Sequence, residues 1–306
     1  MKLIKLILFF SLFNVMSCSD NSGLTQNTPV IPIENLTGTG FFEYSDYGPF
    51  NDKILRIFYH IPENSDTNTE IVFVFHGNGR NAKDYRDAMI SKSNQYNFIT
   101  IAPEFSYSNF PGGDKYNLAN VYVDGDNPTP STLNDEDEWT FSVVEPLFDY
   151  FKNLQNNSSL KYHIFGHSAG GQFVHRFLMF KTNTRTDKVI ISAPGWYTCT
   201  DYSATFPYGF SNSILENISL ENLFDNNLTL LIGDLDNDPN ASALRHNEYA
   251  DAQGLNRFDR ANYFFNKANE IAVDSNIIFQ WSLEINQGAD HSFTTASDKA
   301  ADLIFN

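Results

Sequence analysis

Short apolar runs alternate with helix-like segments from about residue 39 onwards, and no repeat or low-complexity linker interrupts them. Apolar runs bounded by turn residues predict eight strands, at residues 41–44, 54–60, 71–75, 98–102, 162–165, 189–192, 228–232 and 277–285. The first two alternate more between apolar and polar positions, which is typical of an antiparallel edge. The last six are mostly apolar, and this pattern indicates buried parallel strands.

Apolar positions at helical spacing predict five helices, at residues 84–96, 136–154, 169–181, 257–271 and 294–304. In the second of these segments Pro146 interrupts the apolar stripe, so we expect either a kink or two abutting helices. Strands that alternate with helices in this way predict an α/β domain with a mostly parallel sheet.

Two segments, residues 105–133 and 195–227, do not fit the alternation. Both are loop-like, and each follows a predicted parallel strand, at the sheet edge where α/β proteins bind ligands. Their aromatic side chains are candidates for a wall that binds an aromatic acyl group or a sugar. These are Trp196, Tyr197 and Tyr208, with Tyr107, Phe110 and Tyr116 from the earlier segment. Because the chain is 15% aromatic, burial of these rings in the core explains them equally well.

The first 18 residues differ from the rest of the chain. Lys2 and Lys5 precede an apolar run that is too short to span a bilayer, a pattern typical of a signal peptide. The run ends in Val-Met-Ser-Cys18, which resembles a bacterial lipobox, so we expect Cys18 to be lipidated; an ordinary signal peptide ending near a cysteine is the alternative. Residues 19–38 are polar and predict a tether between this anchor and a folded domain at residues 39–306.

Composition narrows the choice of partners. The chain has two cysteines, Cys18 and Cys199, so lipidation of the first leaves no intramolecular pair, and no disulfide is expected. The formal net charge is -17, and removal of Lys2 and Lys5 with the signal segment makes it about -19. Such a surface disfavours nucleic acid and anionic membranes as partners. We therefore expect attachment to the cell envelope through lipid alone, while the oligomeric state stays open.

The run Gly166-His-Ser168-Ala-Gly170 contains the pattern G-x-S-x-G between a predicted strand and a predicted helix. A serine hydroxyl is a weak nucleophile, and it is activated when a sharp turn exposes it beside a base at a helix N-terminus. Gly166 and Gly170 leave room for that turn, and Gly171 allows the helix to pack closely. Ser168 is therefore the candidate nucleophile.

A serine nucleophile also needs backbone donors for the oxyanion and an acid to orient its base. After the strand at 71–75 the sequence His76-Gly-Asn78-Gly forms a small-residue turn, where the N–H of Asn78 can join that of Ala169; an ordinary tight turn is the alternative. After the strand at 228–232, Asp234, Asp236 and Asp238 stand at alternate positions. We favour Asp236, just past the turn, and leave the other two as alternatives.

A calcium loop is a rival interpretation of these three acids. It fails, because Pro239 stands where such a loop needs glycine and Arg245 where it needs glutamate.

The best base among seven histidines is His291, which lies between the last predicted strand and the last predicted helix. His60, His163, His175 and His246 lie on strands, a helix or a polar segment without a strand end, and His76 and His167 are expected to brace the two turns. The order Ser168, Asp236, His291 is the chain order of one class of serine hydrolases.

The chain resembles the α/β-hydrolase superfamily, and is similar to its secreted polyhydroxybutyrate-depolymerase and feruloyl-esterase-like branch. The matching motifs extend from about residue 40 to the end: FHGNGR (75–80), IAPEF (101–105), GHSAGG (166–171), SAPGWY (192–197), GDLDNDP (233–239) and GADHSF (288–293). The resemblance implies an α/β-hydrolase fold, a mostly parallel central sheet flanked by helices, with aromatic-rich loop insertions over the active site.

By that resemblance Ser168 is the nucleophile, His291 the base and Asp236 the orienting acid, and the N–H groups of Asn78 and Ala169 form the oxyanion hole. The implied reaction is hydrolysis of a small or polymeric carboxylic ester through an acyl-enzyme, with no metal or organic cofactor. An acyltransferase or a peptidase with the same triad is one alternative, and a surface lipoprotein that only binds is another.

Overall fold

The computed structural model describes residues 35–306, which form one compact unit, Asn35–Asn306. The predicted signal segment, Cys18 and most of the predicted tether lie outside the described residues.

One eight-stranded sheet, in the order β1-β2-β4-β3-β5-β6-β7-β8, organises this unit. The strands are β1 (Gly38–Tyr44), β2 (Leu55–Ile61), β3 (Ile71–Phe75), β4 (Ile99–Glu104), β5 (Tyr162–His167), β6 (Thr186–Ser192), β7 (Asn227–Gly233) and β8 (Ser282–Asn286). β1 and β2 pair antiparallel, β2 joins β4 antiparallel, and all pairs from β4 to β8 are parallel. The expected antiparallel edge followed by six parallel strands is thereby confirmed.

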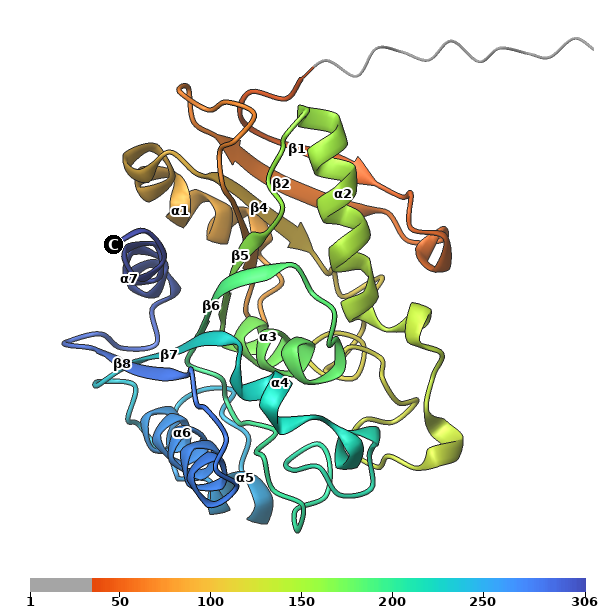
Figure 1. Ribbon diagram of the computed structural model, residues 1–306, viewed down its shortest axis with the longest axis vertical. Coiled ribbons are helices and arrows are strands. Elements are labelled where there is room, and N and C mark those ends of the chain that lie inside the picture. Colours follow the sequence, from red (N-terminus) through yellow and green to blue (C-terminus); the bar gives the residue numbers. More distant parts are fainter. Residues whose placement is uncertain (1–34) are drawn as a thin grey trace, which may run out of the picture. The chain divides into compact units, whose positions relative to one another are not determined.

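The α-helices that connect or follow these strands are α1 (Ala82–Tyr96), α2 (Val144–Gln155), α3 (Ala169–Phe180), α4 (Leu220–Phe224), α5 (Glu248–Ala252), α6 (Arg257–Asp274) and α7 (Phe293–Phe305). α4 and α5 are single turns and a little more, and such short helices have no periodic pattern to predict them. Figure 1 shows α1 and α7 on one side of the sheet and α2 and α3 on the other.

The segment at residues 136–154, for which a kink or two abutting helices was expected, is α-helical only in its second half. Two 3-10 turns, Glu136–Glu138 and Thr140–Val143, precede α2, which begins only at Val144. Pro146 therefore stands in the first turn of α2, where its missing N–H would have had no helical partner. The break lies before the proline, and the proline causes no kink.

The prediction for β8 is wrong in two respects. The strand begins at Ser282, because the apolar side chains before it are used elsewhere: Phe279 and Trp281 pack on Phe224, next to α6. β8 is also half exposed, because it is the last strand at its edge of the sheet and is covered by protein less completely than an interior strand.

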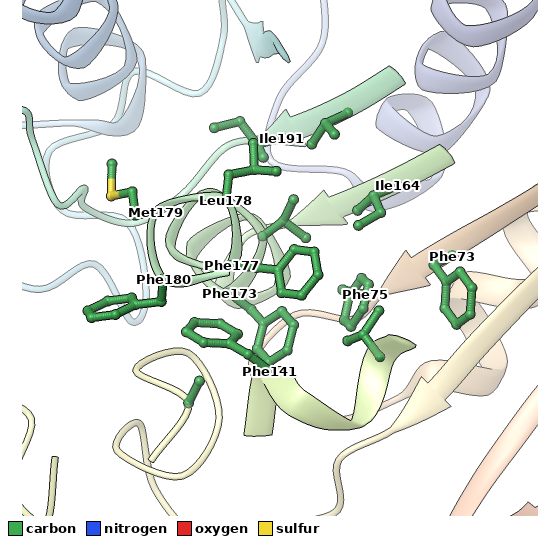
Figure 2. Packing of buried hydrophobic residues seen from close by; sticks show 14 of the residues in the cluster. Phe73, Phe75, Phe141, Ile164, Phe173, Phe177, Leu178, Met179, Phe180 and Ile191 are labelled. Atoms are coloured by element: carbon green, nitrogen blue, oxygen red, sulfur yellow. The ribbon is translucent and has the colours of Figure 1, made fainter. Parts of the chain in front are cut away.

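Each face of the sheet packs in its own apolar cluster, and alternate residues of one strand belong to the two clusters in turn. In β3, Phe73 and Phe75 face the cluster under α2, α3 and α6, and Val72 and Val74 face the cluster under α1 and α7. Figure 2 shows Phe173 and Phe177 of α3 pointing toward β3 and β5 and meeting Phe141. Because these strands are buried on both faces, their carboxyl ends are held in one fixed row.

The loops that contain the candidate site residues leave this row of carboxyl ends, after β3, β5, β7 and β8. Within residues 35–306, every helix is too short or too polar to cross a membrane.

Candidate active site

Ser168 stands at the turn between β5 and α3, with φ 55° and ψ -117°. A positive φ is strained for a residue with a side chain, and it lifts the hydroxyl clear of the strand. The neighbouring glycines permit this turn: a Cβ at Gly166 would strike the carbonyl oxygen of Gly170, and one at Gly170 would strike that of Phe75. The Ser168 N–H donates to the Ser192 carbonyl at 2.8 Å, which ties the turn to β6.

His291 lies on the loop between β8 and α7, and its ring joins Ser168 to an acid. Its Nε2 is 3.2 Å from Ser168 Oγ, and its Nδ1 is 2.7 Å from Asp236 Oδ2. An ionised carboxylate can only accept, so Nδ1 carries the proton and Nε2 is free to accept from the serine hydroxyl. The structure brings the three predicted side chains into one chain of hydrogen bonds. The sequence separations of 123 and 55 residues show that only the fold places them together.

The three acids after β7 have different surroundings. Asp236 is 4% exposed and contacts His291. Asp234 accepts from the N–H of Gly288 at 2.6 Å and so braces the turn that precedes His291, while Asp238 accepts from the N–H of Asn240 at the surface. Geometry therefore separates candidates that the sequence left open.

Arg257, at the start of α6, is a site residue that the sequence did not reveal. Its Nη1 lies 3.4 Å from Asp236 Oδ1, and both side chains are 4% exposed. Asp236 thus accepts from His291 on one oxygen and from Arg257 on the other, which fixes the plane of the carboxylate. No local sequence signal marks it, because an arginine at the first position of a predicted helix is usually solvated.

The turn after β3 is fixed by its own histidine. His76 donates from Nδ1 to the Gly77 carbonyl at 2.9 Å and accepts at Nε2 from the N–H of Phe105 at 3.1 Å, and Tyr116 Oη donates to its carbonyl. Burial lowers the pKa of His76 to about 3, so the ring is neutral and can fill both roles. The following residue Gly77 approaches Ser168 closely, since a Cβ there would lie 3.5 Å from the serine Cβ.

The buried ring of His167 packs against the ring of His291. It is fully buried, its ring centroid lies 4.7 Å from that of His291, and its Nδ1 is 3.3 Å from Ser192 Oγ. Burial is the main reason why the pKa of His167 lies well below its usual range, and the interactions with His291 and Arg257 lower this pKa further. The ring is therefore a neutral packing partner and does not compete for the serine proton.

Ser168 and His291 open onto a cavity of about 440 Å³. Asn78 and Ala169, the two predicted oxyanion donors, line it as well. The remaining wall is rich in side-chain amides and arginines, from Asn81, Asn117, Gln172, Arg245 and Arg257. Among residues 35–306, no group of three or more histidine, cysteine or acidic side chains is arranged to hold a metal ion.

Comparison with known proteins gives the family. No family model and no curated protein matches the sequence. A solved poly(aspartic acid) hydrolase-1 from Sphingomonas sp. KT-1 is 32% identical, with a TM-score of 0.81 over 88% of this chain and 99% of that chain. The chain belongs to the α/β-hydrolase superfamily.

A second α/β-hydrolase, the poly(3-hydroxybutyrate) depolymerase LpqC from Bordetella parapertussis, is 27% identical, with a TM-score of 0.80 over 88% of this chain and 90% of its own. The S-formylglutathione hydrolase FrmB from Staphylococcus aureus, 13% identical with a TM-score of 0.54 over 88% of this chain and 100% of its own, shares the fold. The similarities to the poly(aspartic acid) hydrolase and to LpqC support the branch inferred from the sequence motifs. They also show that this chain is a hydrolase.

Most of the aromatic side chains predicted to form a binding wall in this α/β-hydrolase are buried in the core and do not line the cavity. Trp196 lines the cavity, but Tyr197 and Tyr208 are not among the lining residues. Tyr197 is fully buried against Phe264 at 4.5 Å, because its backbone N–H and carbonyl are both held by Gln253. The Tyr208 ring packs at a tilt against that of Trp196, with the centroids 4.8 Å apart, and its hydroxyl accepts from Arg245 and Asn247.

The aromatic residues of the earlier insertion also lie outside the cavity lining. Phe110 and Tyr116 are buried around Phe105, and Tyr107 is half exposed over Arg80. Burial in the core, the alternative left open by composition, accounts for Phe110 and Tyr116.

Proposed function

We propose that this chain is a serine hydrolase that cleaves carboxylic esters through an acyl-enzyme. Ser168 is the nucleophile, His291 the general base and Asp236 the acid that orients it. The observation that carries the proposal is the pair of contacts on the two nitrogens of one imidazole, 3.2 Å to Ser168 Oγ and 2.7 Å to Asp236 Oδ2. An imidazole with a carboxylate on one nitrogen and a serine on the other has the arrangement that proton transfer from the serine needs.

The steps follow from this arrangement. His291 accepts the Ser168 proton as Oγ attacks the ester carbonyl, and the N–H groups of Asn78 and Ala169 stabilise the negative oxygen that forms. The C–O bond to the alcohol then breaks, and the alcohol leaves with the proton from His291. Water then attacks the acyl-enzyme and gives its proton to His291. The C–O bond to Ser168 Oγ breaks, and His291 returns the proton to Oγ, which releases the acid and free Ser168.

The names of two of these similar structures bear on the bond that is cleaved. One acts on a poly(3-hydroxybutyrate), a polyester, and favours an ester as the substrate. The other acts on poly(aspartic acid), whose units are joined through amides, and it keeps amide hydrolysis as the second candidate. Both bonds would be opened by the same acyl transfer, so the triad alone does not distinguish them.

A fluorophosphonate probe combined with an ester panel tests the proposal. We expect the probe to label Ser168, and Ser168→Ala to lose both labelling and turnover of acetyl, butyryl and aromatic esters while keeping the wild-type melting temperature. A Ser168→Ala variant that still hydrolyses these esters at the wild-type rate contradicts the proposal. A parallel panel of peptides and polyaspartate measures the amide candidate.

We further propose that the protein is exported and is attached to the bacterial cell envelope by lipid on Cys18. This part rests on the sequence of residues 1–18 alone.

A further inference from the structure

The charge of the cavity is opposite to that of the chain. The chain has 37 acidic against 20 basic residues, yet the lining of the cavity beside Ser168 includes Arg245 and Arg257 and no aspartate or glutamate. Arg257 is 4% exposed and is engaged by Asp236. Arg245 is the accessible cation of this lining, with 34% of its side chain exposed.

Arg245 is held in place through only part of its guanidinium group. Nη1 donates to Asp126 Oδ1 at 2.7 Å and to Tyr208 Oη at 3.0 Å, and Nη2 donates to Asp126 Oδ2. Of the five N–H donors of an arginine, the Nε–H and the second Nη2–H remain, and they donate to none of the described residues. These two N–H groups lie on one edge and are parallel, which is the geometry that binds both oxygens of a carboxylate.

A second arginine adds positive charge behind the same wall. Arg176 of α3 is fully buried, has no carboxylate within 4.0 Å in the described part of the chain, and leaves its Nη2 without a hydrogen-bond partner. Its guanidinium carbon lies 4.2 Å from the Trp196 ring centroid, and that of Arg245 lies 4.7 Å from the same centroid. Asp126 balances Arg245, and nothing in direct contact balances Arg176, so an anion at this wall is favoured.

We infer that the cavity accepts esters that carry a free carboxylate, and that Arg245 binds this carboxylate through its Nε and Nη2 edge. The inference rests on the proposed esterase activity and deepens it by naming the substrate class. Asp126 and Tyr208 act as positioning residues, because they hold the guanidinium group in place and leave that edge free.

Two matched substrate pairs test this. The first compares the 4-nitrophenyl monoester of adipic acid with the 4-nitrophenyl ester of adipic acid monoamide, so that the charge is on the acyl side. The second compares O-acetyl-4-hydroxybutyrate with O-acetyl-4-hydroxybutyramide, so that the charge is on the alcohol side. We expect kcat/KM to be higher for the carboxylate member of at least one pair, and the pair identifies the side.

Arg245→Gln should lower the carboxylate-to-carboxamide ratio of kcat/KM by about ten- to a hundredfold, as expected for loss of a charge-assisted bidentate contact. Added salt should lower the wild-type ratio too, because the contact is partly exposed. The control is Arg185→Gln, since Arg185 is equally exposed at 34% and also paired with acids, but it lies just before β6 and does not line the cavity. Its ratio should equal that of wild type.

The outcomes separate the two proposals. Hydrolysis of both members with a wild-type ratio of one or less, or a ratio that Arg245→Gln leaves unchanged, overturns the carboxylate site and leaves the esterase proposal standing. If no ester is cleaved by the folded protein, the esterase proposal fails, and calorimetric titration of Ser168→Ala with adipic acid monoamide then decides the binding site. Binding that Arg245→Gln abolishes supports the site, and absence of binding overturns it.

Discussion

At the scale of single residues, the site depends on side chains that are held from two directions. Asp236 is fixed between His291 and Arg257, and His291 is fixed between Asp236 and the neutral ring of His167. Such double contacts reduce the number of orientations that the His291 imidazole can adopt. They also distinguish Asp236 from its neighbours Asp234 and Asp238, which accept from backbone N–H groups instead.

Asp236→Asn should lower kcat on the order of ten-thousand-fold, the size of the effect in the best-studied Ser-His-Asp triad, because an amide no longer holds the imidazole in the productive tautomer. Asp238→Asn is the control, since that side chain contacts only a surface N–H, and it should retain wild-type turnover. Steady-state kinetics on a short-chain ester measures both. A crippled Asp238→Asn beside an active Asp236→Asn would assign the acid elsewhere and leave the fold unaffected.

At the scale of elements, the turn between β5 and α3 is formed where two backbones approach closely. Gly170 lies against the carbonyl oxygens of Phe75 and His76, so helix α3 can approach the end of β3 only if residue 170 has no side chain. The same closeness places the Ala169 N–H and the turn after β3 on one cavity. We therefore expect stability and ester turnover to depend on the same glycine.

Gly170→Ala should lower the free energy of unfolding by about 1–3 kcal/mol, the usual cost of overpacking, and should lower kcat because α3 must move away from β3. Gly48→Ala is the matched control, since a Cβ at Gly48 meets nothing within 4 Å and its φ is not positive. Chemical denaturation and ester turnover measure both variants. A Gly170→Ala protein with wild-type stability and kcat would show that the approach of α3 to β3 is not needed.

The insertion at residues 195–227 contributes one aromatic ring to the cavity and buries its neighbour. Trp196→Leu should lower kcat/KM for bulky aromatic esters by about ten- to a hundredfold more than for acetyl esters, because a binding wall is removed. Tyr197→Ala should lower stability by about 3 kcal/mol, because its ring packs on Phe264 in the core, and should affect all esters alike. Kinetics across the panel with melting curves measures both. Equal losses on every ester for Trp196→Leu would assign this ring to packing.

At the scale of the whole molecule, the net charge of -17 and the proposed lipid on Cys18 belong together. An acidic surface is repelled by anionic lipid headgroups, so stable attachment to such a membrane requires an acyl chain rather than basic residues. The acidic surface also contrasts with the arginine-lined cavity, and this contrast favours anionic substrates inside over anionic partners outside.

Cys18→Ala should move the protein from the membrane fraction to the soluble exported fraction without a change in ester turnover, because Cys18 precedes the folded unit Asn35–Asn306. Fractionation and mass spectrometry of the mature N-terminus measure this. Wild-type protein with an unmodified Cys18, or a Cys18→Ala variant that stays in the membrane pellet, would reject lipid anchoring.

The sequence by itself determined the mostly parallel sheet and the sharp turn at Ser168, because both depend on local patterns. Buried parallel strands need apolar runs such as residues 71–75, and the turn at Ser168 needs glycine at positions 166 and 170. An apolar run can reflect either a buried strand or a loop whose side chains pack on other elements, and the sequence alone does not distinguish them. In the run at 277–285, the side chains before Ser282 pack on other elements, and only the later residues form the strand.

Only the tertiary structure decided which distant side chains meet. Arg257 and Arg245 carry no local signal, since an arginine on a helix or loop is usually solvated, and their roles depend on contacts with Asp236, Asp126 and Tyr208. Tyr197 and Trp196 are adjacent in sequence and both are buried, yet only Trp196 lines the cavity. Burial and pairing across long separations are properties of the folded chain, and neither composition nor periodicity records them.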